Sequence, residues 1–363
     1  MRIKTITCHE VYNYGASLQE YALLAYLKSQ GHSAEAIHYK PDYLSGHFNL
    51  KAISPTYNKL GIRQLYLLAK LPGRLKGLKR KKAFDVFSQK YIPANGLKYT
   101  SNEELKQQLP DADAYICGSD QIWNPLFPNG KDASFYLDFV PGDKLKIAYA
   151  ASFAVEEIDE NQKTFVRDKV RRLDAVSVRE TSGVEILKNT GIENAIQVVD
   201  PVFLLPAAHW HDEFVQPIAE KFIFVYDFDS NPLIKLHAKK IAKKTGYKIF
   251  TINKNIRYVN RNFYLEGPET FLSLIYNAQY VITNSFHAIA FSLIFEKQFF
   301  EIDRIENINT RMRDLLNLFG LEQRMINDAT NLDVIQEINY QEIHPQIKIA
   351  AEKSKQFLAR NLS

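Results

Sequence analysis

The stretch IKTITCHEVYNYGASLQEYALLAYLKSQGHSAEAIHY, residues 3–39, decides the fold class. Its first residues, Ile3 to Cys8, are typical of a short buried strand, and the run from Ala16 to Gly31 places apolar side chains at helical spacing. Gly31 ends that helix, and a second strand is predicted over Ala34 to Tyr39. A strand, a loop, a helix and a second strand are the usual start of a parallel sheet with crossover helices.

The same alternation continues along the chain and then begins a second time. Further strands are predicted at residues 113–118, 145–153, 174–178 and 195–199, with helices at 157–173 and 182–189. A second series follows, with strands at 221–228, 247–253, 280–285 and 298–303 and helices at 233–245, from Pro268 and from about His287. We therefore expect two Rossmann-like doubly wound domains in tandem, in a glycosyltransferase-B-like arrangement with an interdomain cleft. The first domain is predicted over 1–205 with a basic insertion at 41–100, and the second over 206–363 with a C-terminal helix.

Composition excludes several classes of protein. With 363 residues and 46% hydrophobic residues the chain is long and apolar enough for a substantial core, so a disordered protein is excluded. A net charge of +5 does not indicate a dedicated nucleic-acid binder. The two cysteines, far apart in sequence, form neither a disulfide framework nor a zinc motif. With no secretion signal and no apolar run of membrane-spanning length, we expect a cytoplasmic protein.

The positive charge is concentrated in one place. From Lys59 to Lys82 there are nine Lys or Arg and no Asp or Glu, interleaved with apolar residues. This basic amphipathic pattern is typical of a segment that lies on an anionic membrane surface, here the inner face of the cytoplasmic membrane. Pro72 and Gly73 predict a break into two helical pieces. The alternative is an ordinary helix with a solvated basic face. The predicted membrane-facing residues are Arg74, Lys76, Lys79, Arg80, Lys81 and Lys82.

Two loops at predicted strand ends carry polar groups suited to a sugar. Asn13 and Gly15 follow the first strand, where Gly15 allows close approach of the backbone and leaves helix amides free for an anion or hydroxyl. The segment GSDQIWNP follows the strand at 113–118 and combines amide, carboxylate and indole groups. The alternatives are turns without a ligand and a tryptophan of the core. The candidates in this second loop are Gly118, Ser119, Asp120, Gln121 and Trp123.

Cationic side chains follow three other predicted strands. His287 begins an apolar helix directly after a strand, in the segment NSFHAIAFSLIF, where the alternative is a histidine of the core. Arg179 ends the strand at 174–178, and Arg311 follows the last strand. A guanidinium group matches carboxylate and phosphate, although an arginine taken alone more often forms a surface ion pair.

These segments together resemble the polysaccharide pyruvyl transferase family. The resemblance extends from Ile3 to about Gly320, and its segments stand in the family's order and spacing. They are NYGASLQEYALLAYL with HYKPDYL, then YICGSDQIWNP, AVSVRET, VVDPVFLL and NSFHAIAFSLIF. The sequence departs from the family at Ala288, where similar sequences often have glycine. A lysine that some members carry downstream of the histidine has no clear counterpart here.

The resemblance implies phosphoenolpyruvate as donor, phosphate as leaving group and a pyruvate ketal across two sugar hydroxyls as product. It implies an essential arginine, matching Arg179, and an essential histidine, matching His287. We expect Arg311, Asn284 and Ser285 to bind the donor with Arg179, and the two polar loops to bind a sugar acceptor that is linked to a polyprenyl diphosphate. No metal or cofactor is expected.

Two other functions stay open on the sequence alone. Because fold does not determine the donor, a nucleotide-sugar glycosyltransferase of the same architecture is one alternative. A non-catalytic glycan-binding protein is the other.

Overall fold

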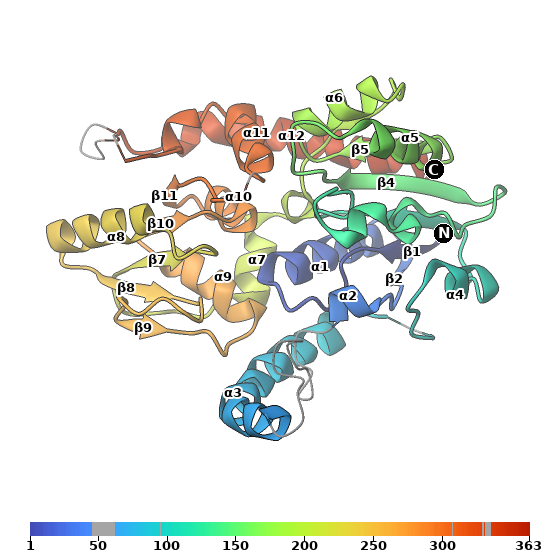
Figure 1. The fold of residues 1–363 in the computed structure, drawn as a ribbon. Helices are drawn as coiled ribbons and strands as arrows, with labels where there is room; N and C mark the ends of the chain where they lie inside the picture. Colours follow the sequence, from blue (N-terminus) through green and yellow to red (C-terminus); the bar gives the residue numbers. More distant parts are fainter. Residues whose placement is uncertain (46–61, 95, 307, 329, 331–334) are drawn as a thin grey trace.

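A computed structural model describes residues 1–363 with the exception of 46–61, 95, 307, 329 and 331–334. Among the described residues, two parallel sheets are each covered by helices (Figure 1). The predicted α/β class with two doubly wound domains in tandem is confirmed.

The first sheet has the strand order β2-β1-β3-β4-β5-β6, with every neighbouring pair parallel. Its strands are β1 (Arg2–Ile6), β2 (Ser33–Ala36), β3 (Ala114–Cys117), β4 (Leu145–Ala151), β5 (Ala175–Val178) and β6 (Ile196–Gln197). Its helices are α1 (Tyr14–Ser29), α2 (Asp42–Ser45), α4 (Asn102–Gln107), α5 (Glu160–Val170) and α6 (Thr181–Asn189), and the short 3-10 helix η5 (Pro201–Leu204) follows. The order reverses between β1 and β3, which is where open α/β sheets bind ligands.

The second sheet has the order β11-β10-β7-β8-β9 and is also parallel throughout. Its strands are β7 (Phe222–Tyr226), β8 (Lys248–Thr251), β9 (Arg261–Asn262), β10 (Tyr280–Thr283) and β11 (Gln298–Glu301). The remaining helices are α7 (Ala207–Phe214), α8 (Pro232–Thr245), α9 (Pro268–Asn277), α10 (Phe286–Ile294), α11 (Thr310–Leu318) and α12 (Tyr340–Asn361). Here the order reverses between β10 and β7, so the ends of these two strands form the second switch point.

Local sequence explains the ends of the first helix. Asn13 caps α1 by accepting a hydrogen bond from the amide of Ala16 at 3.2 Å. Gly31 follows the helix with a φ of 84°, a left-handed conformation that glycine adopts without steric cost. The helix between them is buried along most of its length, because it packs between the first sheet and α9 of the second domain.

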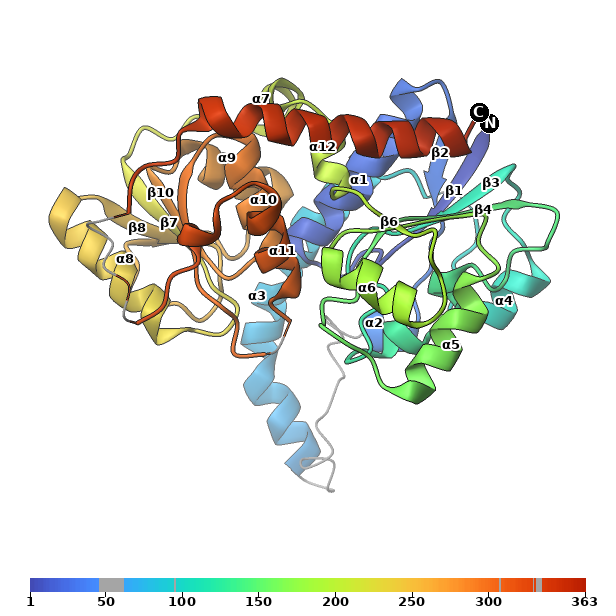
Figure 2. The same ribbon diagram turned by 90° about the horizontal axis from the view of Figure 1, so that it is seen from above.

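One prediction about the basic insertion is wrong. We expected a break at Pro72 and Gly73, but α3 (Ile62–Tyr91) is a single helix of 30 residues. It projects away from the two domains in both ribbon views (Figures 1 and 2), and its C-terminal half packs by Phe84 and Phe87 into the core. The side chains of 62–70 lie outside the described residues, so most of the apolar part of the predicted amphipathic pattern does too, while Leu71 is described and is 38% exposed.

The C-terminal helix joins the two halves of the molecule. Figure 2 shows α12 running along both domains. Tyr340 at its start donates a hydrogen bond to the carbonyl of Lys297 in the second domain at 2.6 Å. Further along, Ser354 accepts one from the amide of Val199 in the first at 2.9 Å. The domain boundary near residue 205 stays a prediction, because this helix belongs to both packing units.

Candidate active site

Polar side chains from both domains meet beside Asp200, at the beginning of η5. Its carboxylate oxygen Oδ2 accepts a hydrogen bond from Nη1 of Arg179 at 2.6 Å and one from the hydroxyl of Ser119 at 3.2 Å. The same oxygen lies 3.5 Å from Nε2 of His287, which comes from the second domain. Asp200 thus joins the ends of β3 and β5 to the start of α10.

Asp200 is a permanent negative charge in this centre. Its side chain is fully buried, which alone would raise its pKa, but the positive charges of His287 and Arg179 outweigh burial and lower the pKa to about 2. Its other oxygen accepts the amide of Val202 at 3.1 Å, which fixes the carboxylate at the start of η5.

Arg179 is buried among three carboxylates. Burial works against its charge, but the carboxylates of Asp200, Asp120 and Glu180 outweigh it and raise the pKa of Arg179. Nη2 lies 3.7 Å from Asp120, and neither Nε nor Nη2 has a hydrogen-bond partner. The guanidinium carbon stands 4.1 Å from the centre of the Phe286 ring. Two of its nitrogens, Nε and Nη2, therefore lack a hydrogen bond, although Nε also lies 3.9 Å from Glu180.

The ring of His287 lies against the first turn of α1. A Cβ atom placed on Gly15 would fall 2.0 Å from Nδ1 of His287, so no other residue fits there without moving the ring. We predicted close approach at Gly15, and the structure shows that a histidine from the other domain makes it. Nε2 faces Asp200 and has no hydrogen bond, so the carboxylate orients the ring by charge at 3.5 Å.

Arg311, at the start of α11, is a second buried cation. Burial and the positive charge of Arg179 lower the pKa of Arg311 to about 10. In the part of the chain that the structure describes, no carboxylate lies within 4 Å of its guanidinium, and Nε has no hydrogen bond. Asp120 and Glu180 also act on it electrostatically, which places it on the side of Asp120 and Arg179. A buried arginine without an acid partner fits an anionic ligand.

A framework of neutral hydrogen bonds positions the first-domain loops. Gln19 of α1 accepts the amide of Ser119 at 3.1 Å and donates to the hydroxyl of Thr7 at 3.1 Å. Thr7 in turn donates to the carbonyl of Ser119 at 2.9 Å. Ser119 is fully buried, so it holds Asp200 in place and does not face a ligand directly. Gly118 lies beneath it, where a Cβ would fall 2.0 Å from the carbonyl oxygen of Tyr149.

The two predicted donor residues beside His287 shape its loop. Asn284 accepts the amide of Phe228 at 3.0 Å and donates to Asp227 at 3.3 Å, which ties the end of β10 to the end of β7. Ser285 caps α10 by accepting the amide of Ala288. Their role in donor binding stays a prediction, while the geometry shows that both position the start of α10.

The prediction for Trp123 is wrong. Its indole is buried in the first-domain core, stacks on Tyr136 with ring centres 5.1 Å apart and donates to the carbonyl of Phe135. Tryptophan fills the core here because its single N–H finds a backbone partner. Gln121 accepts a hydrogen bond from Asn124 within its own turn at 2.8 Å.

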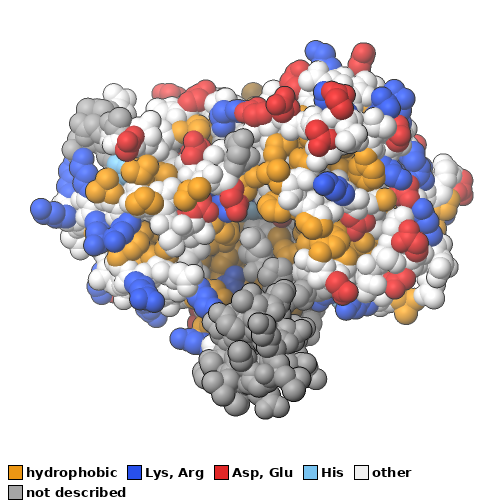
Figure 3. Space-filling view, viewed as in Figure 1, with side chains coloured by type: hydrophobic (Ala, Val, Ile, Leu, Met, Phe, Trp, Pro, Cys, Tyr) orange, Lys and Arg blue, Asp and Glu red, His pale blue; other side chains and the backbone are white. Residues whose placement is uncertain are grey.

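The basic residues of α3 fall into different environments. Lys76, Lys79 and Lys82 are exposed at intervals of three residues, whereas Lys81 pairs with Asp85 at 2.6 Å. The side chain of Arg74 lies outside the described residues. On the face drawn in Figure 3, basic side chains gather over α8 and mix with acidic ones over α5 and α6. None of the helices in the described residues is long and apolar enough to cross a membrane.

The prediction that Arg80 faces a membrane is wrong. Arg80 is buried and lies among the backbone carbonyls of Tyr12 and Tyr264, at 3.0 and 2.9 Å, and the hydroxyl of Tyr14. A helix presents only one face to solvent, so consecutive basic residues cannot all lie on it.

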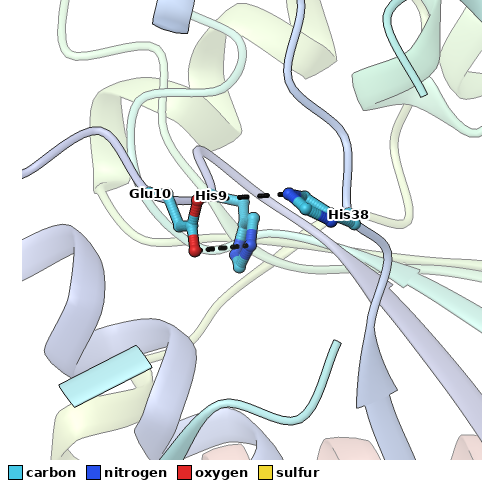
Figure 4. A group of neighbouring side chains, drawn as sticks. All are labelled: His9, Glu10 and His38. Atoms are coloured by element: carbon cyan, nitrogen blue, oxygen red, sulfur yellow. Dashed lines mark ion pairs between the residues drawn. The ribbon is translucent and has the colours of Figure 1, made fainter. Parts of the chain in front are cut away.

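A group of possible metal ligands stands beside β1. His9, Glu10 and His38 bring one ligand atom each within 4.8 Å of one another (Figure 4). Glu20 orients His9 through a contact of 2.7 Å, while Lys40 pairs with Glu10. Lys40 already compensates the charge of the Glu10 carboxylate, so the group is explained as a partly buried ion-pair network. The expectation that no metal is needed stays a prediction.

Sequence reasoning did not single out Asp200, Gln19 or Glu180. Asp200 stands in the segment VVDPVFLL, where an acid between apolar residues was the signal available. Glu180 is buried and accepts three hydrogen bonds, from Ser152 and from the amides of Phe153 and Ala154. Both residues act through partners distant in sequence, so their importance shows only in the folded chain.

Comparison with known proteins gives a family and several distant structural likenesses. A family model described as polysaccharide pyruvyl transferase matches residues 13–304. No curated protein matches the sequence.

Three of the solved structures that resemble the chain are sugar-processing proteins. A UDP-N-acetylglucosamine 2-epimerase from Rickettsia bellii has 11% identity and a TM-score of 0.46, with coverage of 100% of this chain and 96% of that one. A Streptomyces glycosyltransferase complexed with thymidine diphosphate has 11% identity and a TM-score of 0.44, covering 98% and 99%. An E. coli heptosyltransferase with ADP has 10% identity and a TM-score of 0.41, covering 99% and 100%. At such scores, none of these likenesses bears on what this chain binds.

Proposed function

The chain belongs to the polysaccharide pyruvyl transferase family, and we propose that it transfers the pyruvyl group of phosphoenolpyruvate to a sugar, forming a ketal across two hydroxyls. The sugar belongs to a unit of a bacterial capsular, cell-wall or exopolysaccharide, modified in the cytoplasm while it is still linked to a polyprenyl diphosphate. The observation that carries the donor assignment is the unpaired cation of Arg311 beside Arg179.

The two arginines match the two anionic groups of this donor. Phosphoenolpyruvate carries a carboxylate and a phosphate, and a guanidinium group can bind either with two parallel hydrogen bonds. Nε and Nη2 of Arg179 have no hydrogen bond, and Arg311 has no acid within 4 Å among the described residues. Asp200, Asp120 and Glu180 compensate the charge of Arg179, whereas the charge of Arg311 has no carboxylate within 4 Å among the described residues and is left for a donor.

His287 is placed to move the proton. The reaction adds one acceptor hydroxyl to C2 of the enol phosphate while a proton goes to its methylene carbon. Phosphate then leaves C2 with the bonding electrons. The second hydroxyl takes its place at C2 and releases its proton. Asp200 stabilises a protonated His287 at 3.5 Å, and the ring is positioned by Gly15 and Phe286. No step in this scheme uses a metal or an organic cofactor.

The test is a reaction of the purified protein with phosphoenolpyruvate and a bacterial lipid-linked oligosaccharide fraction. We expect release of phosphate and an acceptor whose mass increases by pyruvate less water, with an unchanged rate in EDTA. Phosphate release without that product, or transfer only from a nucleotide sugar, contradicts the proposal.

The donor site is tested by Arg311→Gln. A hydrogen bond to a charged group contributes about 1.5 to 3 kcal/mol, so kcat/KM for phosphoenolpyruvate should fall ten-fold or more. Arg313→Gln is the matched control, because Arg313 lies on the same helix and pairs with Glu156 and Asp314. An unchanged donor KM and kcat in Arg311→Gln excludes the assignment.

A further inference from the structure

A cavity lies between the domains, beside the start of α1. It has a volume of about 340 Å³. Its walls come from both domains and from α3: Tyr12 to Tyr14, Arg80, Tyr226 to Phe228, Ile252 to Ile256, and Tyr264. Three parts of the chain distant in sequence therefore build one concave surface, as ligand sites between domains commonly do.

Arg80 gives this cavity a positive charge, and Asp227 is a lining acid that does not pair with it. Within the described residues the hydrogen-bond partners of Arg80 are neutral oxygens, and no carboxylate lies within 4 Å. Burial raises the pKa of Tyr14 to about 12 despite the nearby arginine, so its hydroxyl stays protonated. Lys254, exposed on the opposite wall, adds a second cation, 5.9 Å from the Tyr264 ring. Two cations around one cavity favour a phosphate group.

Aromatic faces and amides line the rest of the cavity. Tyr226, Phe228 and Tyr264 supply rings, and Phe228 is 40% exposed. Asn13 and Asn253 supply amides that can donate to and accept from hydroxyls. Rings that cover an apolar face, together with amides that bond hydroxyls, suit a pyranose.

The cavity adjoins the catalytic centre through two short connections. Asn13 and Tyr14 line it, and the next residue, Gly15, supports the ring of His287. On the other wall, Asp227 accepts a hydrogen bond from Asn284, three residues before His287. A sugar in this cavity can thus extend toward His287 without crossing a domain.

We propose that this cavity is the acceptor subsite and that it binds a pyranose carrying a phosphate ester, with Arg80 and Lys254 on the phosphate and the aromatic rings on the sugar. The inference rests on the proposed function, because it assumes that a sugar acceptor must lie beside His287. It places the acceptor among residues that are mostly different from Ser119, Asp120 and Trp123, which the sequence indicated.

Binding is measured by calorimetry without turnover, using the 1-phosphates of glucose, galactose, mannose and N-acetylglucosamine. The comparison ligands are the same four sugars in unphosphorylated form, inorganic phosphate, and UMP. At least one sugar phosphate should bind ten-fold or more tightly than its free sugar and than UMP. Arg80→Gln should weaken that binding ten-fold or more, and Arg80→Lys should restore part of it, since a charged hydrogen bond is lost and then partly replaced.

Three further variants make the result specific. Lys254→Gln, at an exposed position that leaves the core intact, should weaken binding by a smaller factor even if Arg80→Gln fails to fold. Lys82→Gln, exposed on α3 away from the cavity, should leave binding unchanged. Arg311→Gln should also leave it unchanged, because that variant empties the donor site and not this one.

The inference is overturned if no sugar phosphate binds more tightly than its free sugar, or if UMP binds most tightly. It is also overturned if Arg311→Gln abolishes binding while Arg80→Gln and Lys254→Gln leave it unchanged. Failure of the proposed function is a separate result. In that case sugar phosphate binding would depend on Arg80, while no phosphate is released from phosphoenolpyruvate.

Discussion

The ring of His287 lies against Gly15 with no room for a side chain between them. The two residues belong to different domains, so this contact fixes how α10 faces α1 at the centre of the molecule. Asp200 and Arg179 complete the arrangement on the other side of the ring. A catalytic imidazole works best when packing and charge both determine its orientation.

His287→Asn tests the imidazole directly. Asparagine keeps a polar side chain but cannot carry the proton, and a positioned general acid or base contributes about 100- to 10,000-fold to the rate. We expect kcat to fall within that range, with a thermal melting curve close to that of the wild type. Turnover near the wild-type rate would show that another group moves the proton.

Gly15→Ala tests the contact itself. The added Cβ would lie 2.0 Å from Nδ1 of His287, so the ring must move away from Asp200, and both stability and kcat should decrease. Alanine otherwise favours a helix over glycine by about 1 kcal/mol. In a His287→Ala background the same change should therefore be neutral or stabilising. Denaturant unfolding of the four proteins measures the coupling, which we expect at about 1 kcal/mol or more; additive effects would refute the contact.

At the scale of elements, α3 combines two tasks on two faces. Its inner face buries Phe84 and Phe87 and brings Arg80 to the cavity between the domains. The exposed lysines that form its outer face are Lys79 and Lys82, which the helical period turns away from Phe84, and Lys76, which lies one turn before Arg80. We propose that this outer face brings the enzyme to an anionic membrane surface that carries the acceptor.

Sedimentation with anionic liposomes tests that surface. Each lysine near such a surface contributes about 1 kcal/mol, so changing Lys76, Lys79 and Lys82 together to Gln should weaken binding by about 100-fold at low salt. Added salt should also weaken the binding of the wild type to the vesicles, because salt screens exposed charges.

The matched control for α3 changes three exposed lysines of α8, Lys235, Lys239 and Lys243, to Gln. That protein loses the same net charge and should bind vesicles like the wild type. Equal binding by all three proteins, or none by the wild type at low salt, would exclude α3 as the docking surface.

At the scale of the whole molecule, α12 connects the two domains beside the segment that carries Asp200. Its start is bound to the second domain through Tyr340, and Ser354 accepts the amide of Val199, the residue next to Asp200. Phe357 packs near Tyr149 of the first sheet, with ring centres 6.3 Å apart. The helix therefore restrains both the interdomain angle and the segment that carries the central carboxylate.

Ser354→Ala tests this connection. It leaves the buried amide of Val199 without an acceptor, which costs about 1 to 3 kcal/mol, and it should lower both the free energy of unfolding and kcat. Tyr340→Phe is the matched change at the other end, since it removes the hydrogen bond to Lys297 but does not touch the Asp200 segment. We expect a loss of stability in both variants and a larger loss of kcat in Ser354→Ala. An equal loss of kcat in the two variants would show that the hydrogen bond of Ser354 does not influence the active site specifically.

Much of the fold was predictable because side-chain periodicity is a local property. The strand and helix at Ile3 to Gly31 and the second series from residue 221 both follow from the spacing of apolar residues. The sequence also indicated Arg179, His287 and Arg311 as candidates, since each follows a predicted strand, Arg311 at a distance of eight residues, and such ends meet at one edge of a parallel sheet. The short strand β9 and helix α7 escaped prediction because neither has enough residues for a clear period.

What the sequence by itself determined is the order of elements, the family resemblance and the positions of the cationic residues. The tertiary structure decided which of these groups meet. Arg80 is part of a basic run in sequence, yet its helix turns it into a cavity, and Trp123 stands in a polar loop, yet its indole fills the core. Asp200 becomes the centre only because two sheets bring Arg179 and His287 to it. The physical reason is that propensity and periodicity act over a few residues, whereas burial and charge pairing depend on how distant segments pack.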